Sequence, residues 1–268
     1  MVNGARFKKD TKSSFVPALA KNAPYYSRLS ARSALYTDFR LLLEGRSHAL
    51  PTRDYRSLVV KENCLARGSA SARHKLWKEL CARYRLEADD PLFTAFWAEW
   101  RQCGSEPERS LTTYVLLALN DRLVAELGTM WLYPLLRRAP SELRVDDVRA
   151  FIKRSRPSHP EVAAWSKNTI DSVSRHYCAS IRDFGLAKGK VRKTTVRPAL
   201  YGSPVRLLVR ALRLVETPLM DLVQSPIFRL LAIDTKEIIG AFGELNRLGA
   251  LHFRMQGDVV ELDLPEAA

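Results

Sequence analysis

The amino-acid sequence predicts a mainly α-helical protein that contains two short β-hairpins. Along most of the chain, apolar residues recur at steps of three and four, as they do on the buried face of a helix. Residues 186–200 and 251–264 instead alternate apolar and polar side chains around a glycine, which is typical of a hairpin. We therefore predict an N-terminal helical bundle followed by two winged helix-turn-helix-like units with short β-hairpin wings.

Basic residues are concentrated in two parts of the chain. The 268 residues carry a formal net charge of +14. Lys and Arg outnumber Asp and Glu by 18 to 6 in residues 1–85 and by 13 to 6 in residues 141–200, whereas acidic residues prevail in 86–140 and 201–268. Charge that served solubility alone would not segregate in this way. A polyanionic partner such as DNA, RNA or an acidic membrane surface is therefore indicated.

Cysteine spacing and hydropathy argue against several classes of protein. The four cysteines lie far apart without a CxxC pair, which disfavours a zinc site and a disulfide framework and favours the reducing cytoplasm. The most apolar stretch, residues 111–136, is interrupted by three charged residues and lacks the roughly 18 uncharged residues of a membrane span. The first 24 residues show no apolar run of a signal peptide. We expect a cytoplasmic protein without a membrane anchor.

The N-terminal half is predicted to be a basic tail followed by a helical bundle. Residues 1–24 hold scattered cations and few aromatic side chains, so we expect a basic, flexible tail. The pattern is helical over residues 25–139, beginning with a helix that ends at Gly45. Aromatic and aliphatic side chains are concentrated in residues 91–137, which we expect to form the core of the bundle.

Within the bundle, residues 62–86 have the pattern of a helix-turn-helix. A turn at Gly68 precedes a helix that Ser69 or Ser71 can cap. A bundle helix with a solvated basic face explains the same pattern and is slightly favoured. Under the helix-turn-helix interpretation, the candidate DNA contacts of this segment are Arg67, Arg73, Lys75 and Lys78.

Residues 140–200 are predicted to form a basic winged-helix unit. A first helix starts at Ser141 or Asp146, a short second helix follows, and Ser166 caps a long third helix that ends at Gly185. The buried face of the third helix is formed by Ile170, Val173, Tyr177, Ile181 and Phe184. The hairpin at residues 186–200 would be the wing.

Residues 201–268 repeat this plan with a weakly acidic charge. Their third helix is expected to be capped by Thr235, and their hairpin turns at Gln256-Gly257-Asp258. The third helix carries few cations and the hairpin is acidic, which suits DNA poorly. Protein contact, through self-association or partner docking, is therefore favoured for this unit.

The sequence shows no group of residues with a spacing suited to catalysis or metal binding. It has no glycine-rich phosphate loop, and its five histidines form no pair with metal-ligand spacing. The adjacent carboxylates Asp89-Asp90 and Asp146-Asp147 lie near predicted helix starts, where negative charge stabilises a helix. We expect a non-enzymatic protein without a cofactor, a metal or a small-molecule substrate.

The unit at 140–200 has the features of a nucleic-acid-binding surface. Its third helix would enter the major groove and its wing would hold phosphates, with weak sequence preference. The aromatic side chains lie mostly at apolar-face positions, which favours double-stranded DNA over RNA. The candidate contacts are Lys167, Asn168, Arg175 and Arg182 on the helix and Lys188, Lys190, Arg192, Lys193 and Arg197 on the wing.

Two segments of the chain resemble a known family. The segments "KENCLARGSASARHKLWKELCARYRL" and "SPIFRLLAIDTKEIIGAFGELNRLGALHFRMQGDVVELDL" are similar to parts of BrxA, the small accessory protein of BREX phage-defence systems. The resemblance covers roughly residues 25–264. It implies a helical, non-enzymatic, DNA-binding protein that works beside a DNA methyltransferase, a large ATPase, a phosphatase-like protein and a protease-like protein. Contact with other BREX subunits would fall to the C-terminal unit.

Two further functions are compatible with the same sequence. A helical scaffold or adaptor that docks partner subunits is motivated by the acidic C-terminal unit. A winged-helix transcriptional regulator is the weaker alternative. It would prefer one operator over random DNA, typically by at least about 10³-fold.

Overall fold

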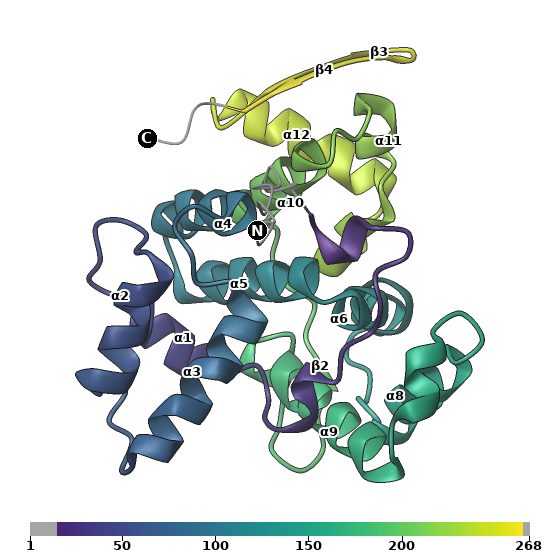
Figure 1. Cartoon of the computed structure of the whole chain (residues 1–268). Helices are drawn as coiled ribbons and strands as arrows, with labels where there is room; N and C mark the ends of the chain where they lie inside the picture. Colours follow the sequence, from purple (N-terminus) through teal and green to yellow (C-terminus); the bar gives the residue numbers. More distant parts are fainter. Residues whose placement is uncertain (1–14, 265–268) are drawn as a thin grey trace, which may run out of the picture.

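The computed structural model describes residues 15–264 and confirms a mainly helical fold with two small antiparallel hairpins (Figure 1). The α-helices are α1 (Tyr36–Leu43), α2 (Thr52–Arg56), α3 (Ala70–Tyr84), α4 (Pro91–Gln102), α5 (Glu106–Asn120), α6 (Arg122–Glu126), α7 (Tyr133–Arg137), α8 (Val145–Arg154), α9 (Lys167–Asp183), α10 (Gly202–Leu214), α11 (Leu219–Val223) and α12 (Thr235–Arg247). The strands are β1 (Ala187–Lys188), β2 (Thr194–Thr195), β3 (His252–Gln256) and β4 (Val259–Asp263).

Short helical segments of other types connect these elements. Two π-helical segments continue preceding helices, namely η3 (Ser57–Lys61) after α2 and η4 (Leu127–Leu132) after α6. The 3₁₀ segments are η1 (Pro17–Leu19), η2 (Arg28–Ser30), η5 (Pro160–Ala164) and η6 (Pro226–Leu231).

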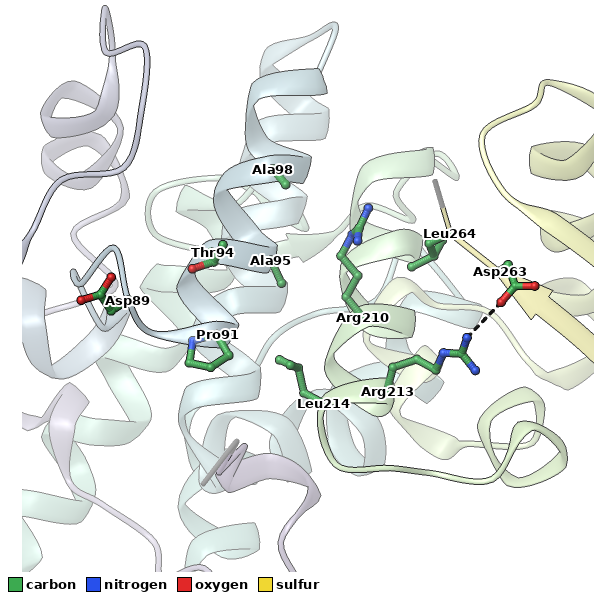
Figure 2. A pocket seen from close by; sticks show the side chains of 10 residues that line it. All are labelled: Asp89, Pro91, Thr94, Ala95, Ala98, Arg210, Arg213, Leu214, Asp263 and Leu264. Carbon is green, nitrogen blue, oxygen red and sulfur yellow. Dashed lines mark hydrogen bonds and ion pairs between the residues drawn. The ribbon is translucent and has the colours of Figure 1, made fainter. Parts of the chain in front are cut away.

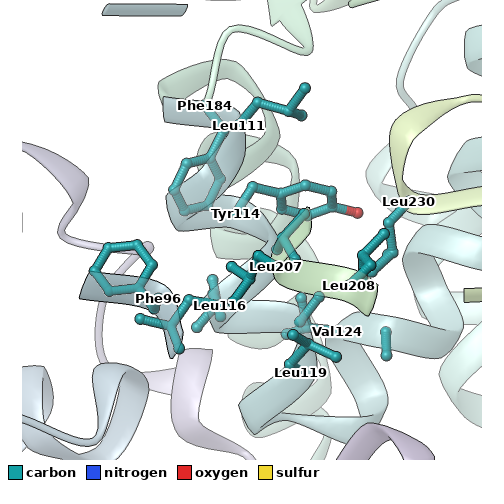
Figure 3. Packing of buried hydrophobic residues seen from close by; sticks show 14 of the residues in the cluster. Phe96, Leu111, Tyr114, Leu116, Leu119, Val124, Phe184, Leu207, Leu208 and Leu230 are labelled. Carbon is teal, nitrogen blue, oxygen red and sulfur yellow. The ribbon is translucent and has the colours of Figure 1, made fainter. Parts of the chain in front are cut away.

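Helix α5 lies at the centre of the molecule and is buried on all sides over most of its length. The Ser105 hydroxyl caps its first turn, and every residue from Ser110 to Asn120 is buried. Helices α4 and α10 pack against it, and Figure 3 shows Leu207 and Leu208 of α10 beside the side chains of α5. Because burial of one leucine stabilises a fold by about 1.5–3 kcal/mol, this contact outweighs any single surface interaction.

A buried ion cluster joins α4 to α10. Glu99 of α4 is fully buried, and its two carboxylate oxygens accept hydrogen bonds from Nε of Arg206 at 2.7 Å and Nε of Arg210 at 2.8 Å. Arg206 also donates a hydrogen bond to the Gln102 side chain at 2.9 Å. Helix α10, which begins the predicted C-terminal unit, is thereby tied to the N-terminal bundle.

The first described residues pack on the bundle. Val16 is buried, and η1 lies against α5 and α6. Arg122 of α6 donates a hydrogen bond to the Ala23 carbonyl at 3.1 Å. The structure thus shortens the predicted flexible tail, because residues 15–24 bury apolar side chains, while residues 1–14 lie outside the described residues.

Helix α8 begins next to Asp146, one of the two starts that the sequence predicts, and not at Ser141. Its first residue is Val145, whereas Ser141 lies in an extended segment beside β2. The Thr195 amide of β2 donates to the Ser141 carbonyl at 2.8 Å, and the Leu143 amide donates to the Lys193 carbonyl at 2.8 Å. This pairing holds residues 141–143 extended, so that β2 lies between them and β1.

Helix α9 matches its predicted boundaries. The Ser166 hydroxyl accepts a hydrogen bond from the Thr169 amide at 3.1 Å, which confirms Ser166 as the cap. At the other end Gly185 has a φ of +76°, the left-handed conformation that commonly follows a helix. All five apolar positions predicted for its inner face are buried.

The C-terminal hairpin projects from one end of the molecule (Figure 1). Helix α12 before it is capped by Asp234, not by the predicted Thr235, because the Asp234 carboxylate accepts from the amides of the first turn while Glu237 reaches back to the Asp234 amide. Strands β3 and β4 pair in register around Gly257, as predicted. Phe253 of β3 packs against α12.

Removal of the Glu99 carboxylate is expected to destabilise the protein. Glu99→Ala leaves Arg206 and Arg210 without their buried partner, so we expect the free energy of unfolding to fall by about 3–5 kcal/mol in urea denaturation. The matched control is Glu142→Ala, which removes an exposed carboxylate paired with Arg144 at 3.3 Å and should cost less than about 1 kcal/mol. Equal effects of the two substitutions would contradict a structural role for the buried cluster.

Asp121 caps α6 from a fully buried position. Its carboxylate accepts hydrogen bonds from the Leu123 amide at 3.0 Å and the Val124 amide at 3.3 Å, with Arg28 at 3.9 Å. Burial raises the pKa of Asp121 to about 6, because the nearby guanidinium and the two amides only partly offset the loss of solvent. The folded protein therefore holds a proton on Asp121 more tightly than the unfolded chain does.

This raised pKa predicts a pH dependence of stability. The contribution of Asp121 is fully present below its unfolded pKa of about 4 and is lost as the pH rises through about 6, which amounts to about 3 kcal/mol. Asp121→Asn keeps an oxygen that can cap the helix and removes the titration. We expect the wild type to lose stability relative to Asp121→Asn between about pH 4 and pH 7, as measured by urea denaturation. Parallel pH profiles for the two proteins would refute this explanation.

Candidate nucleic-acid interface

The first turns of α9 present polar side chains to solvent. The helical spacing buries Ile170 and Val173 and leaves Lys167, Asn168 and Arg175 exposed on the other side. Within residues 15–264, no carboxylate forms an ion pair with Lys167 or Arg175. Both cations are therefore available to a ligand that approaches this side of the helix.

The two acidic residues of α9 are paired with arginines. Asp171 accepts a hydrogen bond from Nε of Arg149 on α8 at 2.6 Å. Asp183 accepts one from the neighbouring Arg182 at 2.7 Å. The structure therefore places Arg182 in an ion pair with Asp183, away from the exposed cations of the first turns. Arg149, which sequence reasoning did not single out, neutralises the carboxylate closest to them.

The hairpin loop carries the most exposed cations of this unit. Strands β1 and β2 are only two residues long, and Lys188, Lys190 and Arg192 are exposed on and between them. Lys193 is half-buried, and its Nζ donates to the Lys190 carbonyl at 3.2 Å. Gly189 has a φ of +98°, and a Cβ there would lie 2.0 Å from the Arg192 carbonyl, so only glycine fits this turn.

Arg197 lies beyond the wing and is bound to the C-terminal unit. It donates to the Glu237 carboxylate at 2.6 Å, and Arg137 of α7 donates to the same carboxylate at 2.5 Å. Burial alone would raise the pKa of Glu237, but hydrogen bonds from Arg137, the Asp234 amide and Arg197 outweigh it and lower the pKa to about 2. The geometry therefore assigns Arg197 to an anchor between the hairpin and α12.

The predicted basic helix at residues 62–86 corresponds to η3, a turn, and α3. Lys75 and Lys78 are exposed, whereas Arg73 is half-buried. Arg67 is bound to Asp38 of α1 in a close ion pair, and the Asn63 side chain fixes the Arg67 backbone from within the turn. Of the four predicted contacts, Lys75 and Lys78 are thus the most accessible.

The end of α8 and the turn after it add three exposed cations that the sequence interpretation left without a role. They are Lys153, Arg154 and Arg156. The first turn of α8 exposes Asp146 and Asp147, so the charges of α8 are negative at its start and positive at its end. Charges in this order interact favourably with the helix dipole and stabilise α8. The cations at its end therefore need no ligand to explain them.

A cavity of about 620 Å³ lies between α4 and α10, away from α9 (Figure 2). It is lined by small and polar side chains, and Arg213 at its edge pairs with Asp263 of β4 at 3.2 Å. Arg210, also in its wall, donates to Glu99. Both arginines are held by carboxylates and do not belong to the exposed basic surface.

Residues 15–264 contain no cluster of three or more His, Cys, Asp or Glu side chains able to hold a metal ion. Over the same residues, no helix has the length and apolar character needed to cross a membrane.

Comparison with known proteins places this geometry in a family. A family model described as BrxA matches residues 23–211, which cover the bundle, α8, α9, the first hairpin and most of α10. The chain belongs to the BrxA family. Membership in the BrxA family points to a BREX-associated protein and confirms the resemblance for residues 61–86. The second resembling segment, residues 225–264, lies beyond the match. No curated protein matches the chain significantly.

Proposed function

We propose that the protein is a non-catalytic accessory of BREX anti-phage defence that binds double-stranded DNA mainly through phosphates. The observation that carries this proposal is the uncompensated positive charge on α9 and the hairpin loop. We call the exposed polar side chains of these two elements the α9–wing surface. It consists of the cations Lys167, Arg175, Lys188, Lys190 and Arg192 and the neutral Asn168.

The strand order around α9 supports a winged-helix arrangement. An extended segment at 141–143 precedes α8, and α9 then leads into β1 and β2, with β2 paired on both sides. In winged-helix proteins the long helix before the hairpin enters the major groove while the loop contacts the backbone. The exposed residues of α9 and the wing are those that would face DNA in this arrangement.

The side chains of the α9–wing surface suit phosphate contacts more than base recognition. Its lysines are flexible point charges that bind phosphate without reading sequence. Asn168, Arg175 and Arg192 have side chains able to make bidentate base contacts, but the guanidinium groups also bind phosphate. We therefore propose low sequence specificity, which separates this function from that of an operator-bound regulator.

Few aromatic side chains are exposed among residues 15–264, and this favours DNA over single-stranded RNA as the ligand. RNA-binding modules stack bases on exposed aromatic rings. Among the described residues, the exposed aromatic side chains are Phe15 and Tyr26, and neither belongs to α9 or the hairpin. The surface can neutralise a duplex backbone but offers no ring for an unpaired base.

The salt dependence of DNA binding tests the proposal. If about six phosphates are neutralised, log K should fall with log salt at a slope of about −5, measured by fluorescence anisotropy on random duplex DNA. Lys188→Gln/Lys190→Gln/Arg192→Gln removes three of these contacts and should bring the slope to about −3. The control Lys236→Gln, on an exposed residue of α12, should leave it unchanged. Salt-insensitive binding, or equal slopes for both variants, would rule out phosphate contact through the wing.

A specific observation favours a second function for the C-terminal unit. Leu248 is 63% exposed, Val259 66% and Met255 40%, at the end of α12 and on the hairpin, beside the acidic Asp258 and Glu261. Arg247 and Arg254 are exposed on the same part of the chain, and exposed apolar side chains among charges of both signs suit a protein partner better than DNA. We propose that this face docks another BREX subunit.

Co-purification with the other BREX subunits tests the docking proposal. Leu248→Ser/Val259→Ser should weaken a nuclease-resistant association, while the wing triple variant should leave it intact. If nuclease treatment alone abolishes the association, the contact runs through DNA and not through this face.

A further inference from the structure

We infer that α3 is a second DNA-contacting surface and that a single duplex bridges it and the α9–wing surface. The inference rests on the proposed DNA binding and deepens it. It adds that two parts of the chain about a hundred residues apart hold the same ligand. The α3 surface is defined here by Arg73, Lys75 and Lys78.

The positive charge of α3 is as uncompensated as that of α9. Helix α3 contains one acidic residue, Glu79, and its carboxylate forms a close ion pair with the fully buried Arg83. Within residues 15–264, no carboxylate pairs with Lys75 or Lys78. The two helices thus follow one pattern, in which each acid is bound to an arginine and the exposed lysines are not.

A segment of the N-terminal region, residues 28–34, is held by α3. The guanidinium of Arg83 donates hydrogen bonds to the carbonyl oxygens of Arg28 at 2.8 Å, Arg32 at 3.0 Å and Ser33 at 3.2 Å. A fully buried cation with several carbonyl partners cannot leave this position without losing all of them. The segment is therefore fixed to the C-terminal end of α3.

The same segment is held by α9 from the other side. The Ala34 amide donates to Oγ of Ser180 at 2.8 Å, and the Leu29 carbonyl lies 2.6 Å from Nδ1 of His176. The Tyr84 hydroxyl of α3 donates to the Ala34 carbonyl at 2.6 Å, so one residue contacts both helices. Helices α3 and α9 are consequently fixed relative to each other, without a flexible linker between them.

The contacts also limit the distance between the two surfaces. The helices meet the segment through their C-terminal halves, and Lys75 and Lys167 lie farther toward their N-termini, whereas the wing cations follow the C-terminal end of α9. At about 1.5 Å per residue, Lys75 lies about 12 Å along α3 from Arg83, and Lys167 about 20 Å along α9 from Ser180. These two lysines are thus up to about 30 Å apart, a distance that one turn of DNA at about 34 Å covers and half a turn does not.

Figure 1 shows where α3 and α9 lie relative to the C-terminal hairpin. Helices α3 and α9 lie in the lower half of the view, on either side of the segment that contains η2, and the C-terminal hairpin lies at the top. A duplex bound across α3 and α9 would therefore leave the C-terminal face clear. The two proposed ligands, DNA and a protein partner, would occupy opposite ends of the molecule.

Duplex length separates a bridged site from a single one. Binding of Lys75→Gln/Lys78→Gln is measured by anisotropy across a salt series on a hairpin-closed duplex of about half a helical turn, which is too short to span both surfaces, and on a duplex of about three turns. We expect the slope of log K on log salt to become shallower by about 2 on the long duplex and to stay unchanged on the short one. Lys236→Gln/Arg254→Gln, with the same charge change at the C-terminal end, should alter neither slope.

Each other outcome overturns a defined claim. An unchanged slope on both duplexes refutes the α3 contact and leaves DNA binding by the α9–wing surface intact. An equal change on both lengths refutes bridging, because the α3 lysines would then bind a duplex too short to reach the α9–wing surface. Capture of a second labelled duplex by a complex with the first shows that α3 holds a different DNA molecule. If the wild type binds neither duplex, both the bridging and the proposed function fail.

Discussion

The buried carboxylate of Glu99 sets the constraint on which the rest of the structure depends. Three charged side chains are removed from water between α4 and α10, and their attraction offsets the loss of hydration only if both helices keep one register. With that register fixed, α5 packs against both helices and the core closes around it. Looser packing of the interior would separate these buried charges and cost free energy. The cluster therefore keeps the helices that carry the surface cations in fixed positions.

The positive surface charge arises because several carboxylates are paired with arginines of the same chain. Glu79, Asp171 and Glu237 each accept hydrogen bonds from arginine side chains of the same chain. Lysines are left exposed because a flexible ammonium gains little from such pairs at the surface. Arginine thus serves mainly in ion pairs within the protein, and lysine is mainly exposed. The surface around α3 and α9 is therefore more strongly positive than the net charge of +14 alone suggests.

Local pattern predicted the helices well, and long-range pairing accounts for what it missed. The spacing of Ile170 to Phe184 and the Ser166 cap required only nearest-neighbour rules, and both hold in the structure. The fate of each cation did not follow from such rules. Arg197 is bound to a residue forty positions later and Arg67 to one twenty-nine positions earlier, which no periodicity encodes. The sequence predicted a tail at residues 15–24 because the partners of their few apolar side chains, among them α5 and α6, lie far away in the sequence.

Glu237 of α12 binds two arginines, Arg137 and Arg197, that flank the strands of the first hairpin. Arg137 precedes the extended segment at 141–143 and Arg197 follows β2. Because these two strands are antiparallel, with Ser141 opposite Thr195, both arginines hold the same end of the small sheet to one carboxylate on α12. The wing loop extends from the opposite end of the sheet. A single carboxylate therefore fixes the base of the wing to α12 and leaves the loop with Lys190 and Arg192 outside this attachment.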